Sequence, residues 1–283
     1  MIQKIRDIAL QLQAAYPKDE AEALAWWLAE ETTGLSRTQL QIGCKDTTNF
    51  SNLQVFVDRL LHFEPIQYIF GHTLWYGLDL KVTPATLIPR PETAELVEVI
   101  GEKLKAKASL ATNHYHSPFA VLDIGTGSGC IAIALKKKHP DWDVTGIDIS
   151  AEAIEVAKEN AKRNGVEVDF LVADIFNLPS PISNLQYDII VSNPPYIRES
   201  EKVSMRPNVL EYEPETALFV PDDDPLRFYR RIASLQGTYL FFEINEAFAQ
   251  EMKTLLQEEG YDDIIITQDI YGKPRIIEGR MVG

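Results

Sequence analysis

The chain contains the stretch Asp188-Ile-Ile-Val-Ser-Asn-Pro-Pro-Tyr196, a short apolar run that stops at two prolines. Its three consecutive β-branched residues predict a buried strand. Because the prolines have no N–H to donate to a β-ladder, we expect the strand to end just before them. Asn193 and Tyr196 are therefore expected at a strand tip, where an amide oxygen, a backbone carbonyl and an aromatic face can meet one small polar group.

A strand tip of this composition suits an NH2 group. The Asn193 side-chain oxygen and the Pro194 carbonyl oxygen can each accept one hydrogen of an amino or carboxamide nitrogen, which fixes the plane of that nitrogen. Tyr196 can supply a face against which a planar substrate group stacks. The alternative is a strand followed by a tight Asn-Pro turn with no chemical role.

A second signal lies upstream, in Val121-Leu-Asp-Ile-Gly-Thr-Gly-Ser-Gly129, which follows a predicted strand and opens a predicted helix. Glycines at alternate positions permit a sharp turn and a close approach of the backbone to a ligand. The pattern is G-x-G-x-G preceded by an acid, whereas a dinucleotide fingerprint is G-x-G-x-x-G. Because the glycines are not followed by the Lys and Ser/Thr of a P-loop, a P-loop nucleotide is not expected.

Polar and aromatic residues also end the next two predicted strands. Asp148 closes the strand after the glycine turn, where its carboxylate can accept hydrogens from both hydroxyls of a ribose. Asp174 and Phe176 follow the third strand and could contact the amino group and the ring face of an adenine. The three strand ends together predict an adenosine pocket.

From residue 119 onward, predicted strands and helices alternate, which is typical of a mostly parallel sheet with helices on both faces. Ligands of such sheets bind at the carboxyl ends of the strands, near the switch in strand order. We expect strands at Ala120–Ile124, Val144–Asp148, Val168–Val172, Asp188–Val191 and Thr238–Ile244, an edge hairpin from Asp263–Thr267 and Arg275–Gly279, and helices at Cys130–Lys138, Ala151–Asn164, Leu226–Leu235 and Ala247–Glu259.

The first part of the chain has a different pattern. Residues 1–70 show apolar positions at helical spacing and predict a bundle of four or five helices, which either recognises a macromolecular partner or acts as a cap. Residues 71–84 alternate apolar and polar residues, which favours a β-hairpin that links the bundle to the domain of residues 85–283. We expect the first helix of that domain from Ala94 to about Lys107.

Composition restricts the possible partners and the compartment. A net charge of −15 disfavours a partner held mainly through phosphates, so we expect no binding to duplex DNA. Cys44 and Cys130 lie far apart and share no metal-binding spacing, which indicates free thiols in a reducing compartment. His114 and His116 lie in a polar loop with no partner cluster, so we expect no metal site. With no secretion signal and no run of 18 apolar residues, we expect a cytoplasmic protein without a membrane segment.

These residues resemble an S-adenosylmethionine-dependent methyltransferase of the seven-strand kind, and more narrowly the release factor glutamine methyltransferase family (HemK/PrmC). The resemblance covers nearly the whole chain. Its segments are the helical front domain, Pro65-Ile-Gln-Tyr-Ile-Phe-Gly71, Leu87-Ile-Pro-Arg-Pro-Glu-Thr93, Asp123 to Gly129, Asp148, and Asn193 to Tyr196. One departure is Ala94, where similar proteins usually carry a glutamate, which weakens any role for an acid at that position.

The resemblance implies an α/β fold with a seven-stranded Rossmann-like methyltransferase sheet behind a helical bundle and a hairpin. It implies that S-adenosylmethionine is the cofactor and S-adenosylhomocysteine the product. It also implies an enzyme that methylates the side-chain amide nitrogen of the glutamine in the Gly-Gly-Gln motif of peptide chain release factors. The implied cofactor-binding residues are Gly125, Thr126, Gly127, Ser128, Gly129, Asp148, Asp174, Phe176 and Asn193; the implied substrate-binding residues are Asn193, Pro194, Pro195 and Tyr196, of which Asn193, Pro194 and Tyr196 are catalytic.

Three alternatives remain open from the sequence. A methyltransferase for a ribosomal-protein glutamine would use identical chemistry. A methyltransferase for an exocyclic base nitrogen would bind an NH2 group with the same two hydrogens. It would also need to extrude the base and to hold the nucleic acid on a basic surface, which the acidic chain does not suggest. A cofactor-binding regulator of translation without catalysis is the non-enzymatic alternative.

Overall fold

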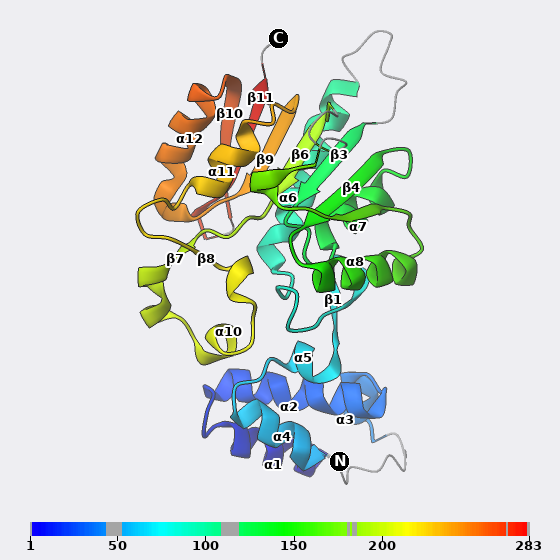
Figure 1. Ribbon diagram of the computed structural model, residues 1–283. Coiled ribbons are helices and arrows are strands. Elements are labelled where there is room, and N and C mark those ends of the chain that lie inside the picture. Colours follow the sequence, from blue (N-terminus) through cyan, green and yellow to red (C-terminus); the bar gives the residue numbers. More distant parts are fainter. Residues whose placement is uncertain are drawn as a thin grey trace. The chain divides into compact units, whose positions relative to one another are not determined.

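The computed structural model describes residues 2–43, 53–108, 119–179, 182, 186–269 and 271–281 (Figure 1). Cys44 and the loop with His114 and His116 lie outside these residues. The chain forms two compact units: Met1–Gly71 with Arg206–Tyr212, and His72–Met205 with Glu213–Gly283. Within the described ranges, no helix is long and apolar enough to cross a membrane.

The first unit is a helical bundle with its own apolar core. Apolar residues at helical spacing on α1 become its buried stripe, which consists of Ile5, Ile8, Ala9 and Leu12. The second helix ends at Gly34, whose left-handed backbone (φ 68°) closes the last turn. The helices are α1 (Ile2–Leu12), α2 (Lys18–Thr33), α3 (Arg37–Gln41), α4 (Leu53–Leu61), α5 (Ile66–Phe70) and the later α10 (Pro207–Leu210).

The α10 segment belongs to this first unit although it is distant in sequence. Arg206 donates to both carboxylate oxygens of Glu20 at 2.9 Å. The Tyr212 hydroxyl donates to the carbonyl oxygen of His62 at 2.8 Å. The sequence pattern had grouped this segment with residues 85–283, because an ion pair between residues so far apart leaves no periodic signal.

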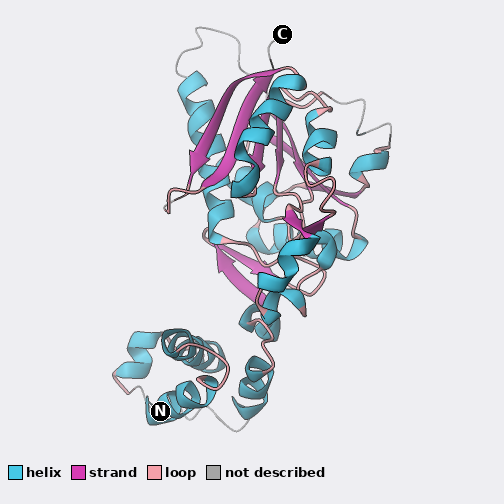
Figure 2. Cartoon of the chain, turned by 90° about the vertical axis from the view of Figure 1, so that its left-hand side faces the viewer, coloured by secondary structure: helices cyan, strands magenta, loops and turns pink. Residues whose placement is uncertain are grey.

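The second unit begins with the predicted hairpin and contains a seven-stranded sheet (Figure 2). Strands β3, β4, β5, β6 and β9 pair in parallel, while β11 pairs antiparallel with both β9 and β10, in the order β10-β11-β9-β6-β3-β4-β5. The strands are β1 (His72–Trp75), β2 (Leu78–Lys81), β3 (Ala120–Ile124), β4 (Asp143–Asp148), β5 (Asp169–Val172), β6 (Ile189–Ser192), β9 (Tyr239–Glu243), β10 (Tyr261–Gln268) and β11 (Pro274–Met281).

Helices cover both faces of this sheet, as the alternation of strands and helices predicted. On β6, Ile189 and Val191 join one apolar cluster with α6 (Pro91–Ala108), α7 (Cys130–Lys138) and α8 (Ala151–Asn164). Ile190, between them, joins the opposite cluster with α11 (Arg227–Ala233) and α12 (Ala249–Glu258). Burial on both faces explains why this strand is continuously apolar.

Helix α6 begins at Pro91, not at Ala94 as expected from the sequence. A proline is tolerated in the first turn of a helix, because the N–H that it lacks would have no partner inside the helix. The earlier start places Thr93 in the first turn of the helix.

The long connection between β6 and α11 also contains regular structure. Strand β7 (Ile197–Arg198) pairs in parallel with β8 (Phe219–Val220). Short helical turns η3 (Glu199–Ser204) and η4 (Glu215–Ala217) lie between them.

Candidate active site

The candidate site lies at the switch point of the sheet. From β3 the chain continues to β4 and β5 on one side, and then to β6, which pairs with the other side of β3. Ile124 is the register partner of Ser192, and the Ser192 hydroxyl donates to the Ile124 carbonyl oxygen at 2.6 Å. The glycine turn follows β3 and the Asn-Pro-Pro-Tyr segment follows β6, so the two segments lie side by side at the edge where doubly wound sheets bind their ligands.

The glycine turn is fastened to the neighbouring strand β4. Its three glycines, Gly125, Gly127 and Gly129, all have positive φ, a conformation that side chains other than glycine rarely adopt. The backbone N–H groups of Gly125 and Thr126 both donate to the Ile147 carbonyl oxygen at 2.9 Å. The turn thus has a fixed backbone path at the end of β3.

A further glycine permits the close packing of β4 on this turn. A Cβ atom placed on Gly146 would lie 2.6 Å from the ring of Phe170 and 2.9 Å from the hydroxyl of Thr126. Such distances are far inside van der Waals contact, so only glycine fits there without a shift of its neighbours.

Asp123, the acid before the glycines, is fully buried. Its Oδ2 atom accepts hydrogen bonds from the Thr126 hydroxyl at 2.6 Å and from the Ala132 N–H at 3.2 Å. Its Oδ1 atom is buried and has no partner within the described part of the chain. Burial raises the pKa of Asp123 to about 7, against the opposing effect of these hydrogen bonds. An unpaired carboxylate oxygen beside the glycine turn fits a cationic ligand group.

Asp148 stands at the end of β4 and is partly exposed. Its two oxygens accept from the N–H groups of Ser150 and Gly127, both at 2.9 Å. Burial raises the pKa of Asp148 above its ordinary value, while these hydrogen bonds oppose the rise. Since a carboxylate has about four acceptor positions, both oxygens can still accept from a ribose.

Apolar surface lies near Asp148. Ile149, the next residue, is 63% exposed, which the sequence analysis did not single out. Phe176 is 37% exposed, and Asp174 caps the short η2 helix (Ile175–Asn177) by accepting from the Phe176 N–H at 2.9 Å. The other Asp174 oxygen accepts from the Asn177 amide at 2.7 Å, so its contact with an adenine stays a prediction.

The Asn-Pro-Pro-Tyr segment is held by three side chains from other elements. Asn193 donates from Nδ2 to the Thr93 hydroxyl at 3.2 Å, and the Tyr196 hydroxyl donates to Glu243 Oε1 at 3.1 Å. Asn245 donates to the Tyr196 carbonyl oxygen at 3.2 Å. In the portion of the chain that the structure describes, Asn193 Oδ1 has no hydrogen-bond partner, so this acceptor is available to a ligand.

Thr93 and Glu243 are site residues that the sequence analysis missed. Both side chains are 2% exposed, and the Thr93 hydroxyl donates to Glu243 Oε2 at 2.7 Å. Burial raises the pKa of Glu243, which the hydrogen bonds from Thr93 and Tyr196 oppose. The available signal was an acid within the otherwise apolar segment 239–244, since an acid is rarely buried without a partner.

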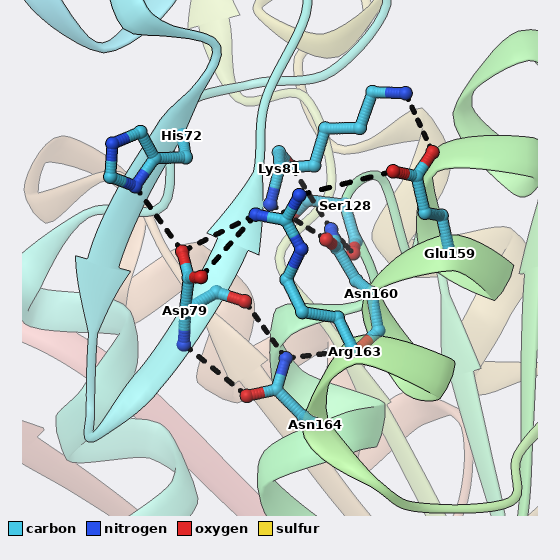
Figure 3. A network of polar contacts seen from close by, with 8 residues as sticks. All are labelled: His72, Asp79, Lys81, Ser128, Glu159, Asn160, Arg163 and Asn164. Atoms are coloured by element: carbon cyan, nitrogen blue, oxygen red, sulfur yellow. Dashed lines mark hydrogen bonds and ion pairs between the residues drawn. The ribbon is translucent and has the colours of Figure 1, made fainter.

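The glycine turn is also connected to the hairpin, through α8 (Figure 3). The buried Asn160 side chain accepts from the Lys81 N–H at 2.7 Å and donates to the carbonyl oxygens of Lys81 at 3.0 Å and Ser128 at 2.9 Å. One turn further, Asn164 makes the same pair of bonds to the backbone of Asp79, at 3.2 and 2.9 Å. Asn160 thereby fixes Ser128 of the turn relative to β2.

Comparison with known proteins identifies both parts of the chain. Residues 116–271 match a family model described as "Methyltransferase domain", and residues 3–71 match one described as "PrmC N-terminal domain". The chain is 43% identical to the release factor glutamine methyltransferase of Bacteroides thetaiotaomicron, over 95% of this chain and 96% of the relative. It is 40% identical to the protein of the same name from Flavobacterium psychrophilum, over 94% of each chain.

A solved structure supports the fold alone. The hMettl16 catalytic domain, crystallised in complex with an RNA hairpin of the MAT2A 3′UTR, gives a TM-score of 0.56 with 74% of this chain and 77% of that chain covered. The sequence identity is 18%, so this likeness concerns the Rossmann-like methyltransferase sheet and not the substrate.

Proposed function

The chain belongs to the release factor glutamine methyltransferase family, and we propose that it methylates the side-chain amide nitrogen of the glutamine in the Gly-Gly-Gln motif of a peptide chain release factor. S-adenosylmethionine is the methyl donor, and S-adenosylhomocysteine is the product. The observation that supports this proposal most directly is the register of β3 and β6, which places the glycine turn beside an Asn193 whose side-chain oxygen has no partner among the described residues.

The Asn-Pro-Pro-Tyr segment binds the glutamine amide. Asn193 Oδ1 and the Pro194 carbonyl oxygen each accept one hydrogen of the NH2 group, which directs the nitrogen lone pair toward the donor. An amide nitrogen is a poor nucleophile because its lone pair is delocalised into the carbonyl, and two acceptors favour the charge distribution of the attacking state. Tyr196 and Pro195 form the surface beside these two acceptors. The surplus proton leaves the nitrogen after the methyl transfer, so no strong general base is required.

The strand ends of β3, β4 and β5 bind the cofactor. When bound, S-adenosylmethionine supplies a methyl group on a positively charged sulfur. The glycine turn lies against its methionine end, where the unpaired Asp123 oxygen offsets the ammonium charge. Asp148 accepts from the ribose hydroxyls, and Ile149 and Phe176 offer the exposed apolar surface that an adenine ring requires.

The partner is proposed to be a protein. A net charge of −15 disfavours a nucleic-acid acceptor and duplex DNA, because such binding depends on neutralising phosphates. We infer that the helical unit contacts the release factor, since it is similar to the PrmC N-terminal domain. An enzyme with this acceptor acts where translation terminates, which places it in the cytoplasm.

The test is transfer of a labelled methyl group to separate purified acceptors: release factor, ribosomal protein and nucleic acid. We expect label on the release factor glutamine, and we expect the Asn193→Ala enzyme to turn over about 100-fold more slowly with its cofactor affinity retained. A release factor with glutamine replaced by alanine in the Gly-Gly-Gln motif should stay unlabelled. Label on the ribosomal protein or the nucleic acid alone would refute the proposed acceptor, and no label on any acceptor would favour a non-catalytic regulator.

A further inference from the structure

We propose that Thr93 and Glu243 are positioning residues that determine which end of the Asn193 side-chain amide faces the substrate. This inference rests on the proposed function, because it concerns how the acceptor of the glutamine NH2 group is presented. Neither residue is proposed to touch the substrate or the cofactor.

The three residues come from separate elements that the fold brings together. Ser192, the last residue of β6, is the register partner of Phe242 of β9, so Asn193 follows β6 at the level of Glu243, the last residue of β9. Thr93 lies in the first turn of α6, and its hydroxyl oxygen is 2.7 Å from Glu243 Oε2 and 3.2 Å from Asn193 Nδ2. The hydroxyl therefore stands between the carboxylate and the amide.

The chemistry of these groups fixes the direction of both hydrogen bonds. A carboxylate only accepts, so the single hydrogen of the Thr93 hydroxyl points to Glu243. Toward Asn193 the hydroxyl oxygen can then only accept. The amide must turn its NH2 group to Thr93, and its oxygen is left for the substrate. Without the hydrogen bonds from Glu243 through Thr93, the Asn193 amide could present either end to the substrate. An outward NH2 group would repel the NH2 group of a glutamine.

Glu243 also fixes the aromatic residue of the same segment. Its second oxygen, Oε1, accepts from the Tyr196 hydroxyl at 3.1 Å. One buried carboxylate thus accepts a hydrogen bond from the Thr93 hydroxyl and another from the Tyr196 hydroxyl. It orients Tyr196 directly and Asn193 through Thr93. A buried acid in an apolar strand is costly, and this double role accounts for its presence at the end of β9.

The test compares variants in methyl transfer to the release factor. In Thr93→Val, the inward Asn193 NH2 group loses its acceptor, so the outward orientation becomes favourable and kcat/KM for the release factor should fall about tenfold. Thr93→Ser keeps the hydroxyl and should restore the wild-type value within about twofold. Glu243→Gln brings an NH2 donor into this series of hydrogen bonds, where the carboxylate only accepts. It should lower kcat/KM by at least as much as Thr93→Val.

Two further measurements separate orientation from simple loss of structure. The affinity for S-adenosylhomocysteine should be largely retained in all three variants, because the glycine turn and Asp148, the main proposed cofactor contacts, are left in place. An unmethylatable release factor with glutamate in place of the glutamine should compete more strongly against Glu243→Gln than against the wild type, because an outward NH2 group of Asn193 can donate a hydrogen bond to the carboxylate. The matched control is Tyr261→Phe, which also removes one buried hydroxyl hydrogen bond, to the Ala233 carbonyl oxygen, but lies outside the site.

The outcomes distinguish this inference from the proposed function. If the wild type methylates the release factor but Thr93→Val performs like Tyr261→Phe, the inference is wrong and the proposed function stands. The inference also fails if Thr93→Ser is as slow as Thr93→Val, or if cofactor affinity falls in parallel with turnover. If the wild type leaves the release factor glutamine unmethylated, the proposed function itself fails.

Discussion

Cofactor binding should remove a proton from Asp123. Burial raises the pKa of this carboxyl group to about 7, and its Oδ1 atom has no partner within the described residues. A ligand ammonium beside this oxygen would favour the carboxylate and lower the pKa on binding. Binding should therefore release a proton from Asp123 at any pH at which this carboxyl group is still protonated in the free protein.

The pKa of about 7 sets the size of this effect. Asp123 should be roughly 90% protonated at pH 6 and roughly 10% protonated at pH 8 in the free protein, so binding should release about 0.9 and about 0.1 proton respectively. The same shift in the pKa of Asp123 makes the folding stability of the free protein depend on pH. Between the ordinary pKa of 3.8 and about 7 the folded state holds more protons than the unfolded state, so the stability of the free protein should fall as the pH rises through this window.

Titration calorimetry with S-adenosylhomocysteine in two buffers of different ionisation enthalpy counts the protons released. The α-amino group of the ligand also titrates near pH 8, so the informative quantity is the difference between the wild type and Asp123→Asn. That difference should be about 0.9 proton at pH 6 and about 0.1 at pH 8. Asp123→Asn should bind the ligand more weakly but should be the more stable free protein at pH 8. Equal proton release by both proteins at pH 6 would refute the reasoning.

Three further predictions concern the framework of the site. Asn160→Ala should lower the free energy of unfolding by about 3 kcal/mol in urea denaturation, whereas Asn164→Ala should lower it by about 1 kcal/mol, because Asp79, to which Asn164 makes two hydrogen bonds, is exposed. Gly146→Ala should lower stability by about 1–3 kcal/mol, because its Cβ atom would overlap the aromatic ring packed on it; an unchanged unfolding midpoint would contradict this. Burial raises the pKa of the Cys130 thiol to about 12, so in a Cys44→Ser protein a thiol reagent at pH 8 should label Cys130 only after unfolding.

The sheet could be predicted from the sequence because its strands carry local signals. The β-branched run before Asn193 became β6, buried on both faces, and the glycine pattern after Asp123 became the turn at the end of β3. Parallel strands align their carboxyl ends at one edge, so residues that follow successive strands were expected to meet there. The placement of Asp148 beside the glycine turn follows from the same rule.

The hydrogen-bond connections could not be predicted in this way. Thr93 and Glu243 meet because α6 packs near β9, and no periodicity records which residue lies opposite which across a fold. Arg206 and Glu20 pair within the helical unit for a similar reason, although four strands of the seven-stranded sheet, β3 to β6, lie between them in sequence. Residues such as these have partners that are determined by packing, and a single sequence does not contain that information.

The most direct measurement is a crystal structure of the protein with S-adenosylhomocysteine and a release factor bound. We predict that the homocysteine end of the ligand contacts residues 125–129, that the ribose meets Asp148, and that the glutamine amide nitrogen lies between Asn193 Oδ1 and the Pro194 carbonyl oxygen with the ligand sulfur facing it. A ligand bound away from the ends of β3 and β4, or a glutamine remote from Asn193, would contradict the central claim that adjacent strand ends unite the methyl donor with an amide acceptor.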